Sequence, residues 1–293
     1  MKMIASAETL PNSTLISTQV AQPTVVIEAN RSWWELDLYE LWKYRELLYT
    51  LSWRDIKTRY TQSLIGVGWV IINPLITIVI LTIIFSYWVK IPSDGLPYPL
   101  FVYTALLPWG YFAKSLERSS TSVAQEASLI TKVYFPRVII PIASTLAGLL
   151  DCAIGFVVVI AMGLWFGITP TWGILALPLF LGLALATSLA VSLWFSALHV
   201  RFRDIAAIAP ILIQAWMYAS PVVYPLSMVP EQWRVVYSLN PMVGVIEGFR
   251  WALLGKASPD FFLMAISTAI VFVLLCGGYL FFKKMERTFA DVI

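Results

Sequence analysis

Six apolar segments of membrane-crossing length restrict the fold of this 293-residue chain more than any other feature. They cover residues 65–89, 98–116, 138–166, 172–198, 205–224 and 261–282. Each is close to or above the ~20 residues that an α-helix needs to cross the hydrocarbon of a bilayer. Charged residues make up only 13% of the chain, against about 25% in soluble domains. The sequence therefore predicts an all-α polytopic membrane protein with six transmembrane helices; segment 98–116 is the weakest, being short and broken by Pro108.

The distribution of Lys and Arg predicts the orientation. If both termini are cytoplasmic, sixteen of the 20 basic residues lie on the cytoplasmic side. Only four lie on the other side: Lys90, Arg234, Arg250 and Lys256. Cytoplasmic loops of membrane proteins are enriched in Lys and Arg, so we expect this orientation.

The chain before the first span divides into two parts. Residues 1–32 are polar and mixed, without a signal-peptide pattern, and we expect a disordered cytoplasmic tail. Residues 33–62 predict an amphipathic helix that lies along the membrane surface. Its apolar residues recur at helical spacing: Leu41, Tyr44, Leu48 and Leu51. Polar residues fall on another face: Lys43, Glu46, Thr50, Arg54 and Lys57. Interfacial aromatic residues accompany them: Trp33, Trp34, Trp42 and Trp53. The alternative is a core helix of a small soluble domain. Residues 63–293 form the six-helix transmembrane domain.

Residues 130–141 place basic and aromatic residues between two apolar runs. The stretch contains Lys132, Tyr134, Phe135, Pro136 and Arg137. Hydrocarbon does not accept irregular backbone, so we expect a short turn at the cytoplasmic face that is presented to a partner. The alternative is a plain interfacial loop, because aromatic and basic residues gather at membrane interfaces.

Residues 225–259 are too apolar for a simple loop. Two short apolar pieces, 233–239 and 243–254, flank Asn240 and Pro241. Neither is long enough to cross a membrane. We interpret them as re-entrant or surface helices on the outer face, between the fifth and sixth spans; an external cap is the alternative.

The sequence lacks the common signatures of catalysis. It has no phosphate-binding P-loop, HExxH, CxxC or GxSxG motif. Cys152 and Cys276 both fall in apolar runs, and His199 is the single histidine. If ATP drives this protein, a separate ATPase subunit hydrolyses it, and no cofactor or metal is expected on this chain.

A few residues within the spans are candidates for lining a conduit. Asp151 is the one carboxylate well inside a predicted span; it is either functional or a hydrogen-bonding partner of a neighbouring helix. Aromatic faces stack on sugar rings without sequence-specific hydrogen bonds, which suits a repetitive polymer that slides. The aromatic candidates are Tyr87, Trp88, Trp216, Tyr218 and Tyr224.

Four blocks in this order resemble the ABC-2-type permeases that export polysaccharides. They are residues 51–63 with Gly66, Trp69, Asn73 and Pro74; residues 130–141; residues 202–205; and residues 220–225 with Asn240, Pro241 and 247–250. The resemblance implies a bacterial inner-membrane homodimer that works with two copies of an ABC ATPase, which binds ATP and Mg. The implied substrate is a lipid-linked glycan such as O-antigen, capsule or teichoic acid. Membrane lipids surround the chain, and no nucleic acid is involved.

The resemblance also assigns roles to residues. The implied ATPase-coupling residues are Thr131, Lys132, Tyr134, Phe135, Pro136, Arg137, Arg201, Arg203 and Asp204. The implied interface-helix residues are Trp53, Arg54, Asp55, Lys57, Arg59 and Tyr60. The implied gate residues are Pro221, Asn240, Pro241, Glu247 and Arg250. On this basis, Glu at position 135 or 137 should uncouple ATP hydrolysis from export without unfolding the chain.

Other functions remain open at this point. An ABC-2 exporter of a drug or simple lipid has the same architecture. A polytopic membrane transferase needs clustered acid–base residues at the interface, for which the chain offers His199 and Asp204. The basic rim around Arg54, Lys57 and Arg59 either attracts an anionic lipid head or reflects the positive-inside bias.

Overall fold

The computed structural model describes residues 38–61, 66–169, 171–255 and 260–292, and these parts of the chain contain helices and turns but no strand. The predicted tail 1–32 lies outside them, as do residues 33–37 and 62 of the predicted interface helix. The all-α class is therefore confirmed for the residues described.

Four helical segments are long and apolar enough to cross a membrane: Gly68–Trp88, Ile139–Trp165, Trp172–Arg201 and Phe261–Phe289. The first joins α3 (Gly68–Leu81) to a π-helical turn, η1 (Thr82–Trp88). The second joins α6 (Ile139–Ala147) to α7 (Leu149–Trp165) across Gly148. The third joins a short 3₁₀ turn, η2 (Trp172–Ala176), to α8 (Leu177–Arg201), and the fourth lies within α12 (Phe261–Val292). The chain is thus a multi-pass membrane protein.

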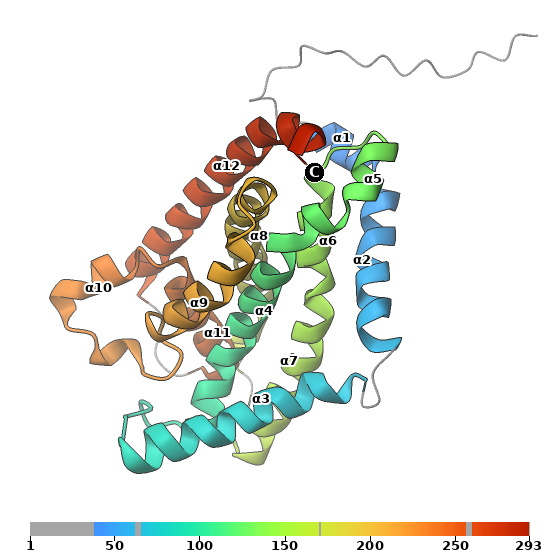
Figure 1. Cartoon of the computed structure of the whole chain (residues 1–293). Coiled ribbons are helices and arrows are strands. Elements are labelled where there is room, and N and C mark those ends of the chain that lie inside the picture. The colour runs from blue at the N-terminus through green and yellow to red at the C-terminus, as the bar shows by residue number, and fades with distance from the viewer. Residues whose placement is uncertain (1–37, 62–65, 170, 256–259, 293) are drawn as a thin grey trace, which may run out of the picture. The chain divides into compact units, whose positions relative to one another are not determined.

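The central helix of the bundle is α4 (Tyr98–Gln125). It lies among α6, α7, α8, α9 and α11 (Figure 1), and most of its first two-thirds is buried. The expected break at Pro108 is wrong, because the helix continues through this buried proline. Tertiary packing on every side outweighs the one backbone hydrogen bond that proline cannot donate. Helix α4 is not among the four segments that are long and apolar enough to cross a membrane, and it carries Lys114, Glu117 and Arg118.

The fifth predicted span is shorter than expected. Helix α9 (Ile205–Tyr218) ends before residue 224. At a rise of 1.5 Å per residue it is about 21 Å long, less than the ~30 Å of hydrocarbon. The chain then turns through buried residues 220–223 and a 3₁₀ turn, η3 (Leu226–Met228). The six-span count is therefore not reproduced by helix length alone.

Two short helices follow, close to the predicted bounds. They are α10 (Glu231–Tyr237) and α11 (Pro241–Leu254). Helix α10 buries no residue, whereas α11 is buried along almost its whole length against α4, α8 and α12. An external cap does not describe α11, because it is an internal element of the bundle.

The predicted interface helix is two helices, α1 (Leu38–Lys43) and α2 (Arg45–Thr61). Helix α2 runs along α6 (Figure 1). The predicted apolar stripe packs on one buried cluster that also contains Ile130, Phe135 and Val138. Trp42, Tyr49 and Trp53 remain exposed. Helix α2 therefore has one face packed on the bundle and another that bears the exposed rings of Tyr49 and Trp53.

Candidate functional site: the coupling surface and its supports

The predicted coupling segment divides into an exposed and an inward-facing part. Helix α5 (Ala127–Lys132) ends at Lys132, and the backbone becomes extended at Val133. Thr131 and Lys132 are exposed, and Val133 and Tyr134 are 52% and 63% exposed. Residues 131–134 therefore form a projecting strip, which we call the coupling strip.

The next residues hold the coupling strip in place. Phe135 is only 3% exposed and belongs to the buried cluster under α2. Pro136 is half-buried. The main-chain N–H of Arg137 donates a hydrogen bond to Glu286 Oε1 at 2.7 Å. This burial speaks against the expectation that Phe135→Glu leaves folding intact, because the substitution would put a carboxylate into a packed apolar core.

The second predicted contact is the turn between α8 and α9. Arg201, Arg203 and Asp204 are all exposed, as is Phe202 between them. The Arg201 guanidinium lies 5.5 Å from the centre of the Phe202 ring. Asp204 precedes α9, and its carbonyl accepts the first main-chain hydrogen bonds of that helix. This turn thus presents a mixed charged surface.

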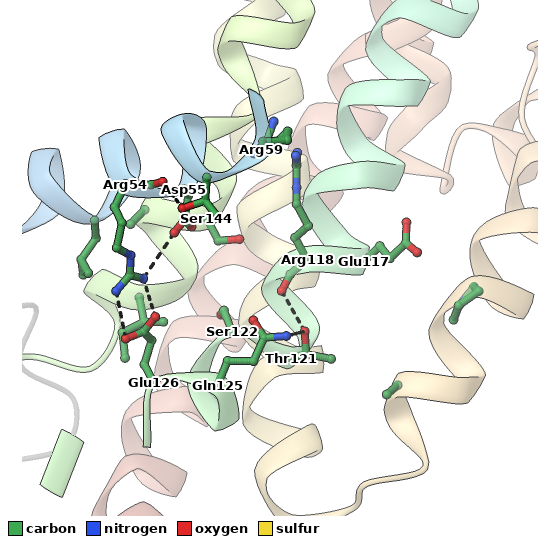
Figure 2. A pocket seen from close by; sticks show the side chains of 16 residues that line it. Arg54, Asp55, Arg59, Glu117, Arg118, Thr121, Ser122, Gln125, Glu126 and Ser144 are labelled. Atoms are coloured by element: carbon green, nitrogen blue, oxygen red, sulfur yellow. Dashed lines mark hydrogen bonds and ion pairs between the residues drawn. The ribbon is translucent and has the colours of Figure 1, made fainter. Parts of the chain in front are cut away.

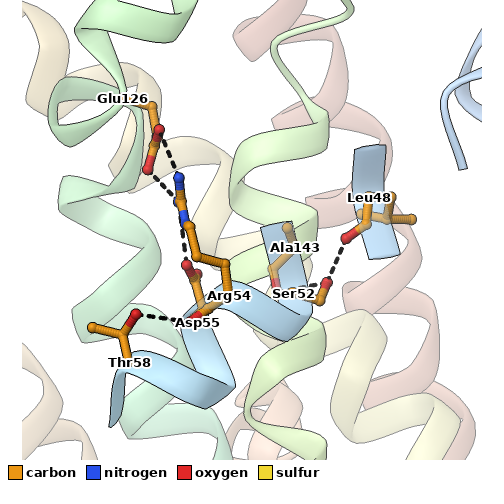
Figure 3. Close-up of polar contacts among 7 residues, drawn as sticks. All are labelled: Leu48, Ser52, Arg54, Asp55, Thr58, Glu126 and Ala143. Atoms are coloured by element: carbon orange, nitrogen blue, oxygen red, sulfur yellow. Dashed lines mark hydrogen bonds and ion pairs between the residues drawn. The ribbon is translucent and has the colours of Figure 1, made fainter. Parts of the chain in front are cut away.

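The α2 helix is fastened to the bundle by polar contacts (Figure 3). The Arg54 guanidinium donates to both carboxylate oxygens of Glu126, which joins α4 to α5, and also to Asp55 at 3.3 Å. Ser52 Oγ donates to Leu48 O at 2.8 Å and to Ala143 O on α6 at 3.3 Å. Exposed Trp53 stacks on Tyr49.

Asp151 lies in a charged cluster that joins α2, α4 and α7. Its Oδ2 is 2.9 Å from Arg59 Nη1 and 3.8 Å from Arg118 Nη1, and its Oδ1 accepts a hydrogen bond from the Tyr60 hydroxyl. Burial and this carboxylate raise the pKa of Tyr60 to about 12. Of the two interpretations of Asp151, the structure supports the hydrogen-bonding partner of neighbouring helices.

A pocket of about 770 Å³ lies between α2, α4, α6 and the start of α9 (Figure 2). Its charged lining residues balance in sign: Arg54, Arg59, Arg118, Asp55, Glu117 and Glu126. Two of the three residues of the predicted basic rim, Arg54 and Arg59, are paired with carboxylates. Lys57, the third, is exposed and forms no ion pair with the other residues that the structure describes. The pocket is thus polar but carries no large excess of positive charge.

Asn240 organises the predicted gate region. Its Oδ1 caps α11 at Met242 N (3.0 Å) and accepts from Trp216 Nε1 (2.9 Å). Its Nδ2 donates to Ala219 O and Ser220 Oγ, both at 2.9 Å. One side chain therefore fixes the start of α11 to the end of α9, with Pro241 buried as the first helical residue.

Arg250 fastens the other end of the same region. Its buried guanidinium lies 2.8 Å from Glu247 Oε1 and 3.7 Å from the centre of the Phe101 ring, and donates to Val222 O at 3.2 Å. Tyr98 OH donates to the neighbouring carbonyl of Val223. Helix α11 and the turn at 220–223 are thus pinned onto α4.

Most of the conduit candidates are engaged within the protomer. Trp216 packs its ring edge-on to Phe112. Tyr224 shares a 2.8 Å hydrogen bond with Tyr237, and Pro221 is buried. The exposed candidates are Tyr87, Trp88 and Tyr218. These three are the better candidates for contact with a substrate or a second copy.

Sequence reasoning missed the charged partners. Three such contacts join residues that lie far apart in the sequence. They are the ion pairs of Arg54 with Glu126 and of Asp151 with Arg118, and the hydrogen bond from Arg137 N–H to Glu286. The spacing of residues along one segment carries no signal for such pairs.

Comparison with known proteins defines the class. The model of the ABC-2 type transporter family matches residues 46–254, and the chain belongs to this family.

The relatives are more specific. An O-antigen export system permease protein RfbA of Myxococcus xanthus is 29% identical over 258 residues, covering 87% of this chain and 98% of that protein. A protein of the same name from Klebsiella pneumoniae is 28% identical over 260 residues, with the same coverage. The polysialic acid transport protein KpsM of Escherichia coli is 28% identical over 209 residues, covering 69% of this chain and 78% of that protein.

Proposed function

We propose that the chain is the transmembrane subunit of an ATP-driven exporter of a lipid-linked polysaccharide, with O-antigen as the foremost substrate class. The observation that carries this proposal is similarity over 98% of the length of permeases named for O-antigen export. The polysialic acid transport protein points to the same class of polymer. An exporter of drugs or simple lipids would have the same architecture, but the relatives described above are named for polysaccharides.

The coupling strip is where we place the ATPase. Four consecutive exposed residues, 131–134, are followed by buried Phe135 and by Arg137, which is bonded to α12. A projecting segment with a rigid base transmits a push to the bundle. The exposed turn 201–204 supplies the second contact. ATP and Mg bind to the partner, of which two copies serve two copies of this chain.

The remaining parts of the proposal concern the membrane. The chain lies in the bacterial inner membrane with both termini cytoplasmic, in agreement with the Lys and Arg bias. Helices α9, α10 and α11 form the outer-face gate, with α11 re-entrant. The burial of α11 supports this arrangement. The non-helical residues 219–225 fit it as well, because irregular backbone at membrane depth is tolerated where protein encloses it, and residues 220–223 are buried.

Reconstitution tests the proposal. The chain is purified together with the ATPase that accompanies it and placed in proteoliposomes that contain a lipid-linked O-antigen. We expect ATP-dependent movement of the glycan across the bilayer, read out by an externally added glycan-specific lectin.

The matched control is the same complex with an ATPase that binds but does not hydrolyse ATP. Equal movement in both would contradict ATP-driven export. ATP-driven movement of the lipid carrier without its glycan, at the same rate, would favour the exporter of a simple lipid. Turnover of a lipid-linked donor by the chain alone would favour a transferase.

A further inference from the structure

Helix α12 connects the coupling segment to the opposite end of the bundle. Near its C-terminal end, Arg137 and Glu286 bind each other in two ways. The main-chain N–H of Arg137 donates to the Glu286 carboxylate, and the Arg137 guanidinium donates to the Glu286 carbonyl. Phe282 and Phe289 of α12 belong to the same buried cluster as Phe135. The base of the coupling strip is therefore attached to α12 by polar and apolar contacts together.

The middle of α12 fits closely against α8. Trp194 Nε1 donates to Leu274 O at 3.1 Å, and the Trp194 ring stacks on Phe281. A Cβ added at Gly278 would lie 2.9 Å from Ala190 O and from the Trp194 ring. No side chain fits at that position without a shift, so α12 is held in one register along α8.

The other end of α12 carries the predicted outer-face helices. Ser267 Oγ donates to Ser238 O, between α10 and α11, at 2.8 Å, and both serines are fully buried. A Cβ added at Gly244 of α11 would lie 2.8 Å from Ser267 Cβ. The backbone of α11 at Gly244 therefore packs directly against the Ser267 side chain of α12.

We propose that α12 transmits displacement of the coupling strip to helices α10 and α11. Glu286 is the positioning residue: its contact with Arg137 passes the movement of the coupling strip to α12. The proposal rests on the proposed function, which makes residues 131–134 the ATPase contact. Ser267 and Glu286 are about 28 Å apart along one uninterrupted helix, close to the ~30 Å thickness of the hydrocarbon. A continuous hydrogen-bonded helix moves as a unit over this distance, so both ends respond together.

Helix α4 offers a competing route. It leads through Glu126 into α5, and its opposite end contacts Val223 and Arg250. The two routes differ in one respect, because only the α12 route passes through the Arg137–Glu286 pair. Removing the Glu286 side chain takes away the carboxylate bond to the Arg137 N–H and leaves the bond to the Glu286 carbonyl, so a weakened response at the far end of α12 identifies the α12 route.

Two spin labels on the complex with its ATPase, in lipid nanodiscs, test the proposal. Cys276 is exposed and is first replaced by Ala, whereas Cys152 is buried. One label is placed at exposed Val133 in the coupling strip and the other at exposed Val235 on α10; because Val133 lies in the proposed contact, the labelled chain is used only after co-purification shows that the ATPase still binds it. We expect both labels to change mobility when a non-hydrolysable ATP analogue binds. In Glu286→Ala we expect the Val133 response to persist and the Val235 response to decrease, because the carboxylate that accepts from the Arg137 N–H is lost.

Three further variants separate positioning from folding. Glu286→Gln keeps an oxygen that accepts from Arg137 N–H and should restore the Val235 response. Ser267→Ala removes the bond at the far end and should reduce the Val235 response alone. Lys284→Ala, at an exposed site on the same helix, should behave as the native chain. ATP hydrolysis should continue in Glu286→Ala while glycan movement falls.

The outcomes are distinct. A native complex whose Val133 label ignores the analogue would overturn the coupling assignment and with it the role of α12. A Val133 response together with an undiminished Val235 response in both Glu286→Ala and Ser267→Ala would leave the proposed function standing and assign transmission to α4.

Discussion

At the scale of single residues, the coupling segment 130–141 contains side chains with two different roles: some are exposed to a partner and others are buried in the bundle. Val133 is 52% exposed and Phe135 3% exposed, although only one residue separates them. The sequence pattern of 130–141 predicted a presented turn but did not show which side chains face outward. Tertiary packing decides this: Phe135 belongs to the buried cluster under α2, whereas strand-like alternation would place residues 133 and 135 on the same side.

Matched substitutions at these two positions test the division. Val133→Glu should leave thermal stability near the native value and weaken binding of the ATPase. Phe135→Glu should lower the free energy of unfolding by more than ~3 kcal/mol, because it buries a carboxylate in an apolar cluster. Fluorescence-monitored melting in detergent and co-purification of the ATPase measure both. Equal melting temperatures for the two variants would contradict the assigned burial of Phe135.

Asp151 is the second residue with a specific expectation. Asp151→Asn keeps the shape but removes the charge that faces Arg59 and Arg118. We expect a loss of roughly 1–3 kcal/mol in stability, because two partly buried guanidinium groups lose their counter-charge. Glu231→Gln, at a side chain that is 90% exposed, is the control and should melt like the native chain. Parallel shifts in both variants would argue against the cluster as a tie between α2, α4 and α7.

At the scale of elements, local patterns predicted which segments are helical and where α10 and α11 lie in the sequence, but not how helices end or pair. Helix α4 passes through Pro108 because the other helices of the bundle enclose it. Helix α9 ends early because the turn at 219–220 is held by Asn240 from a later segment. The Arg54–Glu126 pair joins residues of different elements. Each of these contacts joins segments that are distant in the sequence and forms only in the folded chain. The residue pattern within a single segment therefore cannot predict it.

The attachment of α2 gives a prediction at this scale. Arg54→Ala and Glu126→Ala should each lower the melting temperature slightly, and the double variant should lower it by less than the two effects combined. The pair is partly exposed, so the coupling energy should be about 0.5–1 kcal/mol. A double-mutant cycle of thermal unfolding measures this energy, and purely additive effects would show that the pair contributes nothing to holding α2.

At the scale of the whole molecule, the chain has the exposed apolar surface of a membrane subunit. Along α3 and η1, exposed side chains include Trp69, Ile76, Val79, Tyr87 and Trp88. Lipid or a second copy covers such a surface. Because two-fold dimers are the commonest closed assemblies, we expect native mass spectrometry of the purified complex to show two copies of this chain with two ATPases. A complex with a single copy would contradict the proposed homodimer.

The central claim is that the chain exports a finished lipid-linked polysaccharide. The most direct measurement deletes its gene and assays surface polysaccharide and cytoplasmic lipid-linked polymer in the same cells. We predict that surface polysaccharide is lost while polymer accumulates inside, and that the native gene restores both levels. Unchanged surface polysaccharide would contradict the claim, and loss of polymer from both compartments would point to a role in synthesis instead.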